Sequence, residues 1–328
     1  MKVVKYENSG ILFIDKDNVV IKHGGENVIF YNAFLKEIFR INVDISTNHI
    51  VKSYDKKFIV FDRNRSIVYD QEGVMLNEDS NYYFSYDFDG SIFIDENEDK
   101  LIISKEKLLI FPYTYGEKIF SQNYYVQVYD DEKFLKSYSL KDGSEIWTRK
   151  FNEFIDSFYV EYQRGIIDYN SCLYFIIYSE GIIKCIVVDI KTGNLLNEYR
   201  GLYGEMILDG NFLYFLSSDD ISVLNLETEE LKTFSITNIF ESSEIKRLHF
   251  PRWHVRNRIV YFTQSASVDM HSGNTGAIFG ALDIQQLKIL WYETIPKQHG
   301  IIGTIHVDNE RIYLHTQDQT LFIYEVEK

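Results

Sequence analysis

Short apolar runs alternate with clusters of polar turn residues along the whole chain. Val, Ile, Phe and Tyr dominate the runs, and Asp, Asn, Gly or Lys bound them about every 8–12 residues. This pattern is typical of an all-β sandwich, barrel or propeller. Representative runs are residues 10–14, 58–61, 92–94, 173–178, 212–216, 259–262 and 312–314. No amphipathic helix of three turns is expected, because the best candidate, residues 151–158, is too short and too aromatic.

The strands differ in how their apolar residues are distributed. Residues 173–177 and 212–216 are continuously apolar, as required when both faces of a strand are covered. Residues 195–200 and 230–234 mix apolar with polar side chains, as at a sheet edge that faces water. A four-stranded propeller blade between two neighbouring blades produces this gradient, whereas a sandwich more often gives plain alternation. The pattern therefore favours a propeller.

A degenerate strand–turn–strand segment repeats along the chain. Its clearest copies are residues 138–147 and 188–197, and weaker copies are residues 224–233 and 282–291. The third strand of each unit is centred near residues 30, 68, 102, 138, 188, 224, 282 and 323. The intervals average about 42 residues, which matches the four short strands and turns of one propeller blade.

We therefore predict a single all-β domain over residues 1–328, a β-propeller of four-stranded blades. Eight blades are expected, and seven is the alternative because the division of residues 82–151 is ambiguous. The last unit, residues 301–328, supplies three strands. Residues 2–6 are expected to supply the fourth and to close the ring, which hides sheet edges that invite aggregation. The two longest intervals are expected to hold insertions near residues 151–170 and 246–276.

The repeated turn resembles the PQQ-like (quinoprotein dehydrogenase-like) propeller repeat, in which Asp-x-x-Thr-Gly is followed by x-x-x-Trp. The matching residues are Asp189, Thr192 and Gly193 in one copy, Gly143 and Trp147 in another, and Asp283 and Trp291 in the most degenerate copy. Glycine can take a positive φ at such a turn, Asp or Thr can bond nearby backbone N–H groups, and the Trp can pack one blade on the next. The motif covers about half of the chain, and it indicates architecture rather than catalysis.

The resemblance implies a non-enzymatic member of that family. Its quinoprotein enzymes are exported and hold a quinone and Ca²⁺ on the ring axis, but this chain lacks a vicinal cysteine pair and a clear set of axial ligands. No cofactor is therefore expected. The family also includes an outer-membrane assembly lipoprotein that only binds proteins, although its lipidated N-terminal Cys has no counterpart here. Protein binding is thus the function implied by analogy of fold.

Charge and cysteine content narrow the function classes further. The chain has 49 acidic and 34 basic residues and a net charge of −15, which disfavours nucleic acid and anionic membranes and favours a basic partner. It begins without an apolar signal segment, so a cytoplasmic location is expected. Cys172 and Cys185 fall on strands joined by a turn near residues 180–181. Antiparallel pairing then places Cys185 opposite about residue 176, which predicts two reduced thiols.

Two sets of polar residues in the last third of the chain are candidate sites. A metal site is conceivable at His249, His254, Asp269 and His271 if the 246–276 insertion folds over one face, but no HxxxH or HxH pair supports it, and ordinary loop and strand histidines are the favoured interpretation. A partner-docking loop is predicted from a basic, aromatic run and the small polar loop that follows, because Arg and Trp are enriched at binding hot spots. Its residues are Arg252, Trp253, His254, Arg256, Met270 and His271. The alternative is a solvated insertion whose charges pair with local acids.

These observations favour a cytoplasmic, non-catalytic propeller that binds another protein, and no catalytic residue is predicted. A narrower hypothesis is a bacterial immunity-type protein that neutralises a cationic toxin. The alternative is a carbohydrate-active hydrolase or lyase, or a small-ligand binder, that uses the central mouth of the propeller. The sequence leaves the oligomeric state open.

Overall fold

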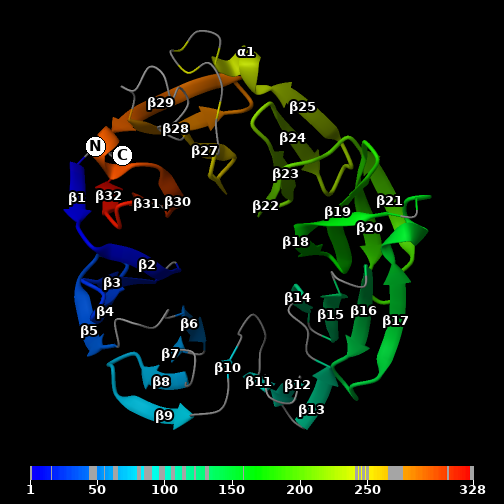
Figure 1. Cartoon of the computed structure of the whole chain (residues 1–328), viewed down its shortest axis with the longest axis horizontal. Coiled ribbons are helices and arrows are strands. Elements are labelled where there is room, and N and C mark those ends of the chain that lie inside the picture. The colour runs from blue at the N-terminus through cyan, green and yellow to red at the C-terminus, as the bar shows by residue number, and fades with distance from the viewer. Residues whose placement is uncertain are drawn as a thin grey trace. The chain divides into compact units, whose positions relative to one another are not determined.

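The chain folds into antiparallel sheets of four strands each (Figure 1). The computed structural model describes residues 2–15, 17–43, 50–54, 56–61, 66–79, 83–84, 91–95, 100–104, 108–112, 116–121, 123–129, 133–157, 159–240, 243, 245, 248, 251–264, 276–308 and 310–325. Within these ranges there are eight such sheets. The prediction of an all-β chain built from four-stranded propeller blades is confirmed, with eight blades rather than seven.

Two compact units divide the chain, and the first joins Met1–Val51 to Ile207–Lys328. One of its sheets contains β2 (Ser9–Ile14), β3 (Asn18–His23), β4 (Asn27–Asn32) and β5 (Glu37–Asn42). The next contains β22 (Glu205–Asp209), β23 (Phe212–Leu216), β24 (Asp220–Asn225) and β25 (Leu231–Ser235). A third contains β26 (Trp253–Arg256), β27 (Ile259–Gln264), β28 (Ala277–Asp283) and β29 (Lys288–Ile295). The last contains β30 (Ile302–Val307), β31 (Arg311–Thr316), β32 (Leu321–Glu325) and β1 (Lys2–Tyr6).

The second unit is Lys52–Met206. Its first sheet contains β6 (Ile50–Tyr54), β7 (Lys57–Phe61), β8 (Ser66–Asp70) and β9 (Met75–Asp79). The following one contains β10 (Tyr83–Phe84), β11 (Ser91–Asp95), β12 (Lys100–Ser104) and β13 (Leu108–Pro112). Two more contain β14 (Lys118–Phe120), β15 (Tyr124–Tyr129), β16 (Phe134–Ser139) and β17 (Glu145–Lys150), and then β18 (Glu161–Tyr169), β19 (Cys172–Ser179), β20 (Ile182–Asp189) and β21 (Leu195–Arg200). The expectation of one domain over residues 1–328 stays a prediction.

All eight predicted third-strand centres fall inside the third strand of a sheet. The centres near residues 30, 188 and 323, for example, lie in β4, β20 and β32. The N-terminal strand was also predicted correctly: β1 pairs with β32 along its whole length, from Lys2 opposite Glu325 to Tyr6 opposite Leu321. This pairing covers the edge of β32, whose backbone groups would otherwise be left unpaired.

The core lies around the middle strands of the sheets for which burial is described, as sheet β18–β21 shows. β19 is almost entirely buried, whereas β21 at the edge of the same sheet is half-buried or exposed throughout. This is the gradient predicted from the apolar runs. Cys185 in β20 lies opposite Ile176, as expected, and both cysteines are free thiols. Burial raises the pKa of the Cys185 thiol to about 12, so this side chain acts as a small apolar group.

Regular structure occupies much of the two predicted insertions. In the first interval, residues 161–169 form β18, whose apolar pattern is interrupted by a bulge between Gln163 and Ile167 with Gly165 at φ 113°. The connection is therefore only residues 151–160, and it begins with the 3₁₀ helix η1 (Phe151–Glu153). The second interval contains β26 and β27, joined by a turn that lacks Gly and Pro.

Helices are short in the part of the chain that the structure describes. They are α1 (Ile236–Phe240), η1 and η2 (Lys297–His299). None of the described helices is long and apolar enough to cross a membrane.

The repeated motif fastens one sheet to the next, as predicted. Trp147 in β17 is 6% exposed, and its indole N–H donates to the carbonyl oxygen of Ile190 in the following sheet at 2.8 Å. A β-carbon added at Gly193 would lie 2.6 Å from the indole ring, so only glycine fits beneath it. Gly193 has φ 67°, a conformation that glycine adopts without penalty. The Trp therefore requires the Gly on the neighbouring turn.

Side-chain hydrogen bonds shape the turn that receives this indole. The carboxylate of Asp189 accepts the backbone N–H groups of Lys191 and Thr192 at 2.9 and 2.7 Å, and the Thr192 hydroxyl at 2.9 Å. From the preceding sheet, the Arg149 guanidinium donates to the carbonyl oxygen of Gly193 at 2.9 Å. The predicted roles of Asp and Thr are thus confirmed as structural.

Candidate functional site

Among the residues proposed to bind a metal, the structure describes only His254. His249, Asp269 and His271 lie outside the described residues. In the described ranges, three or more His, Cys, Asp or Glu side chains do not come together in a way that could hold a metal ion. His254 in β26 instead packs against His306 in β30, with ring centroids 4.8 Å apart.

Burial keeps this histidine pair neutral. The pKa of His254 is lowered to about 4, mainly by burial and then by the nearby His306 and Arg256, against smaller opposing effects of the Val307 backbone and Asp209. Burial also lowers the pKa of His306. Arg256 donates to the carbonyl oxygen of Val307 at 3.4 Å, which ties β26 to β30. The pair thus joins two sheets through uncharged rings.

Folding is expected to weaken as the pH falls from about 6.5 towards about 4. The unfolded chain binds a proton at His254 near its ordinary pKa of 6.5, whereas the folded chain resists it down to about 4. The stabilising contribution of the neutral His254 ring is complete above about pH 6.5. It is lost progressively as the pH falls towards about 4. Urea unfolding at about pH 7.5 and about pH 5 measures the loss. A smaller loss is expected for His254→Gln, and an equal loss in both proteins would contradict this assignment.

Among the predicted docking residues that the structure describes, only Arg252 is exposed. Trp253 is 6% exposed and packs in the core of its sheet with Val255 and Phe262. Trp253 is therefore a core residue and is not available for direct contact with a partner. Arg256 and His254 contact β30, through the Val307 carbonyl oxygen and the His306 ring respectively. Met270 and His271 lie outside the described residues.

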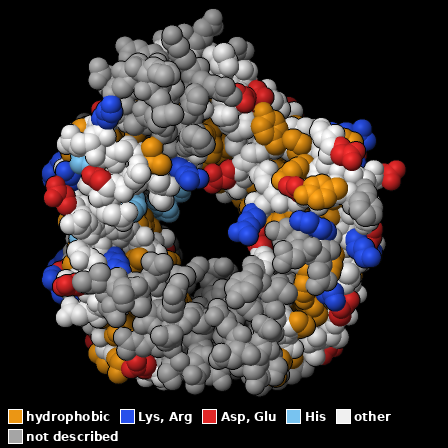
Figure 2. Space-filling model, in the orientation of Figure 1, with side chains coloured by type: hydrophobic (Ala, Val, Ile, Leu, Met, Phe, Trp, Pro, Cys, Tyr) orange, Lys and Arg blue, Asp and Glu red, His pale blue; other side chains and the backbone are white. Residues whose placement is uncertain are grey.

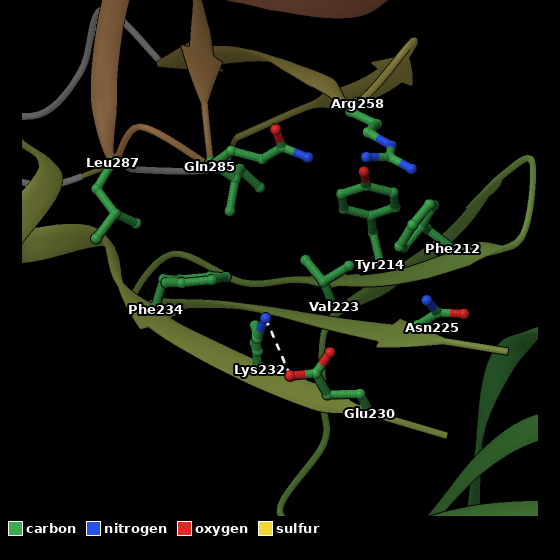
Figure 3. Close-up of a pocket in the computed structure, with 11 residues that line it drawn as sticks. Phe212, Tyr214, Val223, Asn225, Glu230, Lys232, Phe234, Arg258, Gln285 and Leu287 are labelled. Atoms are coloured by element: carbon green, nitrogen blue, oxygen red, sulfur yellow. Dashed lines mark ion pairs between the residues drawn. The ribbon is translucent and has the colours of Figure 1, made fainter. Parts of the chain in front are cut away.

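A cleft between sheets β22–β25 and β26–β29 is a candidate site lined mainly by aromatic and aliphatic side chains. Its volume is about 480 Å³, within the range typical of ligand-binding pockets. Figure 3 shows side chains of β23–β25 facing residues from two turns of the other sheet. The lining residues are Phe212, Tyr214, Val223, Asn225, Glu230, Lys232, Phe234, Arg258, Ile284, Gln285 and Leu287.

Apolar side chains form the walls of the cleft, and charged groups lie at its mouth. The Arg258 guanidinium lies over the Phe212 ring, 4.3 Å from its centroid. The backbone N–H of Arg258 donates to the Asp209 carboxylate at 2.8 Å, which holds the turn in place. Lys232 and Glu230 form an ion pair at 3.0 Å, and both side chains are 59% exposed. The ion pair lies in solvent, and the interior is left to aromatic and aliphatic groups.

Tyr214 contributes a neutral phenol to the floor of the cleft. Burial raises its pKa to about 12, and the nearby Asp209 acts in the same direction. The ring is 3% exposed, so it belongs to the floor rather than to the rim. A floor of this kind favours a flat apolar group over a charged one.

The sequence analysis did not single out this cleft. The available signal was the departure from the repeat, because the copy at residues 224–233 lacks both the Trp and the Gly, and the copy at residues 282–291 lacks the Gly. The sequence pattern alone indicates only degeneration of the motif there. The two copies lie on the two sides of the cleft.

Comparisons with known proteins establish the fold alone. No family model matches the chain, and no curated protein matches it. BamB from Moraxella catarrhalis is similar in structure, with a TM-score of 0.61, 12% identity and 99% coverage of both chains. The dihydro-heme d1 dehydrogenase NirN, solved in complex with DHE, has a TM-score of 0.56 and 13% identity over 88% of this chain and 66% of that one. The WD40 domain of SCAP from fission yeast has a TM-score of 0.56 and 7% identity over 99% of this chain and 94% of that one. The chain thus has a β-propeller fold.

Proposed function

We propose that this protein is a protein-binding β-propeller whose partner inserts a short segment into the cleft between β22–β25 and β26–β29. The observation that carries the proposal is the cleft itself, which combines a buried aromatic floor with a charged mouth. Pockets of this kind act as anchor sites at protein interfaces, where one buried apolar side chain supplies much of the binding energy. Use of a β-propeller to bind proteins agrees with the fold-level analogy to BamB.

Charge favours a basic partner. The net charge of −15 attracts cations over long distances and accelerates their encounter with the protein. On the face shown in Figure 2, acidic and basic side chains are interspersed. This long-range attraction follows from the net charge of the whole chain. A cationic toxin bound by an immunity-type protein in the cytoplasm is the specific case that the sequence predicts, and genetic linkage to a toxin reading frame tests it.

Leu287→Asp is expected to weaken partner binding at least tenfold, about 1.4 kcal/mol. Leu287 is 49% exposed and forms part of the cleft wall, so a carboxylate there must be desolvated when an apolar side chain enters. The measurement is the affinity of the purified partner by calorimetry at low and moderate salt. The partner itself is first identified by crosslinking from the native host.

Leu195→Asp is the matched control, because Leu195 is 48% exposed and does not line the cleft. This variant should bind like the unaltered protein. Arg252→Glu tests the docking residue that the sequence predicted and that remains exposed. If binding survives Leu287→Asp and is lost in Arg252→Glu, the partner uses the β26 surface and the cleft proposal is wrong.

A further inference from the structure

The cleft lies at the register position where two other sheets of the chain carry a tryptophan. In sheet β14–β17, Trp147 pairs with Ser137, which in turn pairs with Val126. In sheet β22–β25, the same row is Lys232, Val223 and Tyr214. The corresponding position in β29 is Trp291, opposite Ala281. Lys232 therefore stands at the register position that Trp147 and Trp291 hold in their own sheets, whereas sheet β18–β21 has Asn197 there.

The turn on the other side of the cleft carries a matching change. By position in the turn, Ile284 corresponds to Ile190, and Leu287 corresponds to Gly193. Gly193 must be glycine because a β-carbon would lie 2.6 Å from the indole of Trp147. Leu287 keeps the same left-handed backbone, with φ 51°, but carries a full side chain. The pair Trp147 and Gly193 of one junction thus corresponds to Lys232 and Leu287 at the other.

The junction between β14–β17 and β18–β21 is filled by an indole, whereas the junction between β22–β25 and β26–β29 is not. At the first junction, Val126, Trp147 and Ile190 form one buried cluster, with Tyr124 packed against it. At the second, the counterparts Tyr214 and Ile284 also belong to one buried cluster with Phe212 packed against it, and these three residues line the cleft where no indole covers them. Lys232 does not fill the space, because its ammonium group pairs with Glu230 at the exposed mouth (Figure 3).

We infer that the cleft receives an aromatic side chain, and specifically a tryptophan, from the partner's segment. The segment would supply across the interface the indole that Trp147 supplies within the chain. Its N–H is expected to donate to the carbonyl oxygen of Ile284, as the Trp147 N–H donates to that of Ile190. The Arg258 guanidinium at the mouth can donate to a backbone carbonyl of the same segment. This inference rests on the proposed function and names the anchor that it uses.

Placing a tryptophan at position 232 of the chain itself tests whether the cleft has the shape of a tryptophan site. The double variant Lys232→Trp/Leu287→Gly restores both partners of the fastening. Its thermal unfolding midpoint should equal or exceed that of the unaltered protein. Lys232→Trp alone should unfold at a lower temperature, because the β-carbon of Leu287 occupies the place of the ring. A double variant less stable than Lys232→Trp would overturn the assignment.

Binding of N-acetyl-L-tryptophanamide tests the ligand class without any partner. We expect chemical-shift changes at Tyr214, Phe234 and Leu287 in the unaltered protein, with a dissociation constant on the order of millimolar. N-acetyl-L-leucinamide should bind at least threefold more weakly, and the double variant should lose binding of the tryptophan probe at least tenfold. Equal binding by the double variant, or equal affinity for the two probes, contradicts the inference.

The outcomes separate this inference from the proposed function. If Leu287→Asp abolishes partner binding but the tryptophan probe does not bind, the cleft is a protein-binding site and its anchor is not a tryptophan. If the tryptophan probe binds but Leu287→Asp leaves the affinity of the partner unchanged, the cleft binds tryptophan and the proposed function is wrong.

Discussion

Replacing Trp147 by alanine is expected to lower the free energy of unfolding by about 3–5 kcal/mol, the usual cost of removing a large buried aromatic side chain. The ring is 6% exposed and lies in the cluster that joins sheets β14–β17 and β18–β21. Its loss leaves a cavity and removes the donor to the Ile190 carbonyl oxygen. Urea unfolding followed by tyrosine fluorescence measures the change.

Ile146→Ala is the control for this prediction. Ile146 precedes the tryptophan on the same strand but is 39% exposed. Its truncation should cost about 0.5 kcal/mol or less, as for most surface substitutions. If both variants lose similar stability, the tryptophan does not hold the two sheets together.

Gly193→Ala is expected to destabilise the protein by about 2–5 kcal/mol, from two separate costs. A residue with a β-carbon at φ 67° pays about 1–2 kcal/mol for the left-handed backbone. The added carbon also meets the indole of Trp147 at 2.6 Å, and overpacking of this kind costs about 1–3 kcal/mol. Thermal or urea unfolding of the purified variant gives the sum.

Gly210→Ala separates the two costs. Gly210 has a similar φ of 62°, and nothing lies within 4 Å of the position that its β-carbon would take. This variant should therefore show the backbone cost alone. Gly193→Ala should also be milder when Trp147 is already alanine, with a coupling of about 0.5–3 kcal/mol. Additive losses in that double variant would mean that the ring and the glycine do not constrain each other.

Most of the architecture was predictable from the order of apolar and polar residues. The third strand of each sheet is covered on both faces, so it appears in the sequence as a recognisable apolar run at a regular interval. This is why the strand centres near residues 30, 188 and 323 were placed correctly. The closing strand was predictable for a related reason, because the last unit lacked one strand and residues 2–6 had no other sheet to join.

The predicted insertions show where local patterns fail. β18 was missed because Gly165 and the surrounding bulge interrupt its apolar alternation. β26 was missed because its tetrapeptide is basic and aromatic, which is also the composition of a binding loop. Burial of Trp253 in the core decides between the two interpretations, and burial depends on which residues of distant segments pack against it.

The cleft could not be predicted, because its location depends on strand register, and an alignment of the repeat copies does not show which residues pair. When the ten-residue copies are aligned, Thr233 falls on the position of Trp147. In the structure, a bulge between Ser137 and Tyr138 leaves Ile146 unpaired, whereas β24 and β25 pair without a shift. The residue opposite Val223 is therefore Lys232. One residue of shift reverses the face that a side chain occupies, so the missing tryptophan could be located only after pairing was known.

The sequence by itself determined the fold class, the strand that completes the last sheet and the role of the repeated turn, and it favoured eight blades over seven. These features follow from hydrophobic burial and backbone conformation, which act over a few neighbouring residues and leave a periodic trace. Only the tertiary structure decided that Trp253 is a core residue and that Lys232 faces Leu287 across an unfilled space. Such contacts join residues about 50 positions apart through strand register and sheet packing, and these arise only when the whole set of strands has paired.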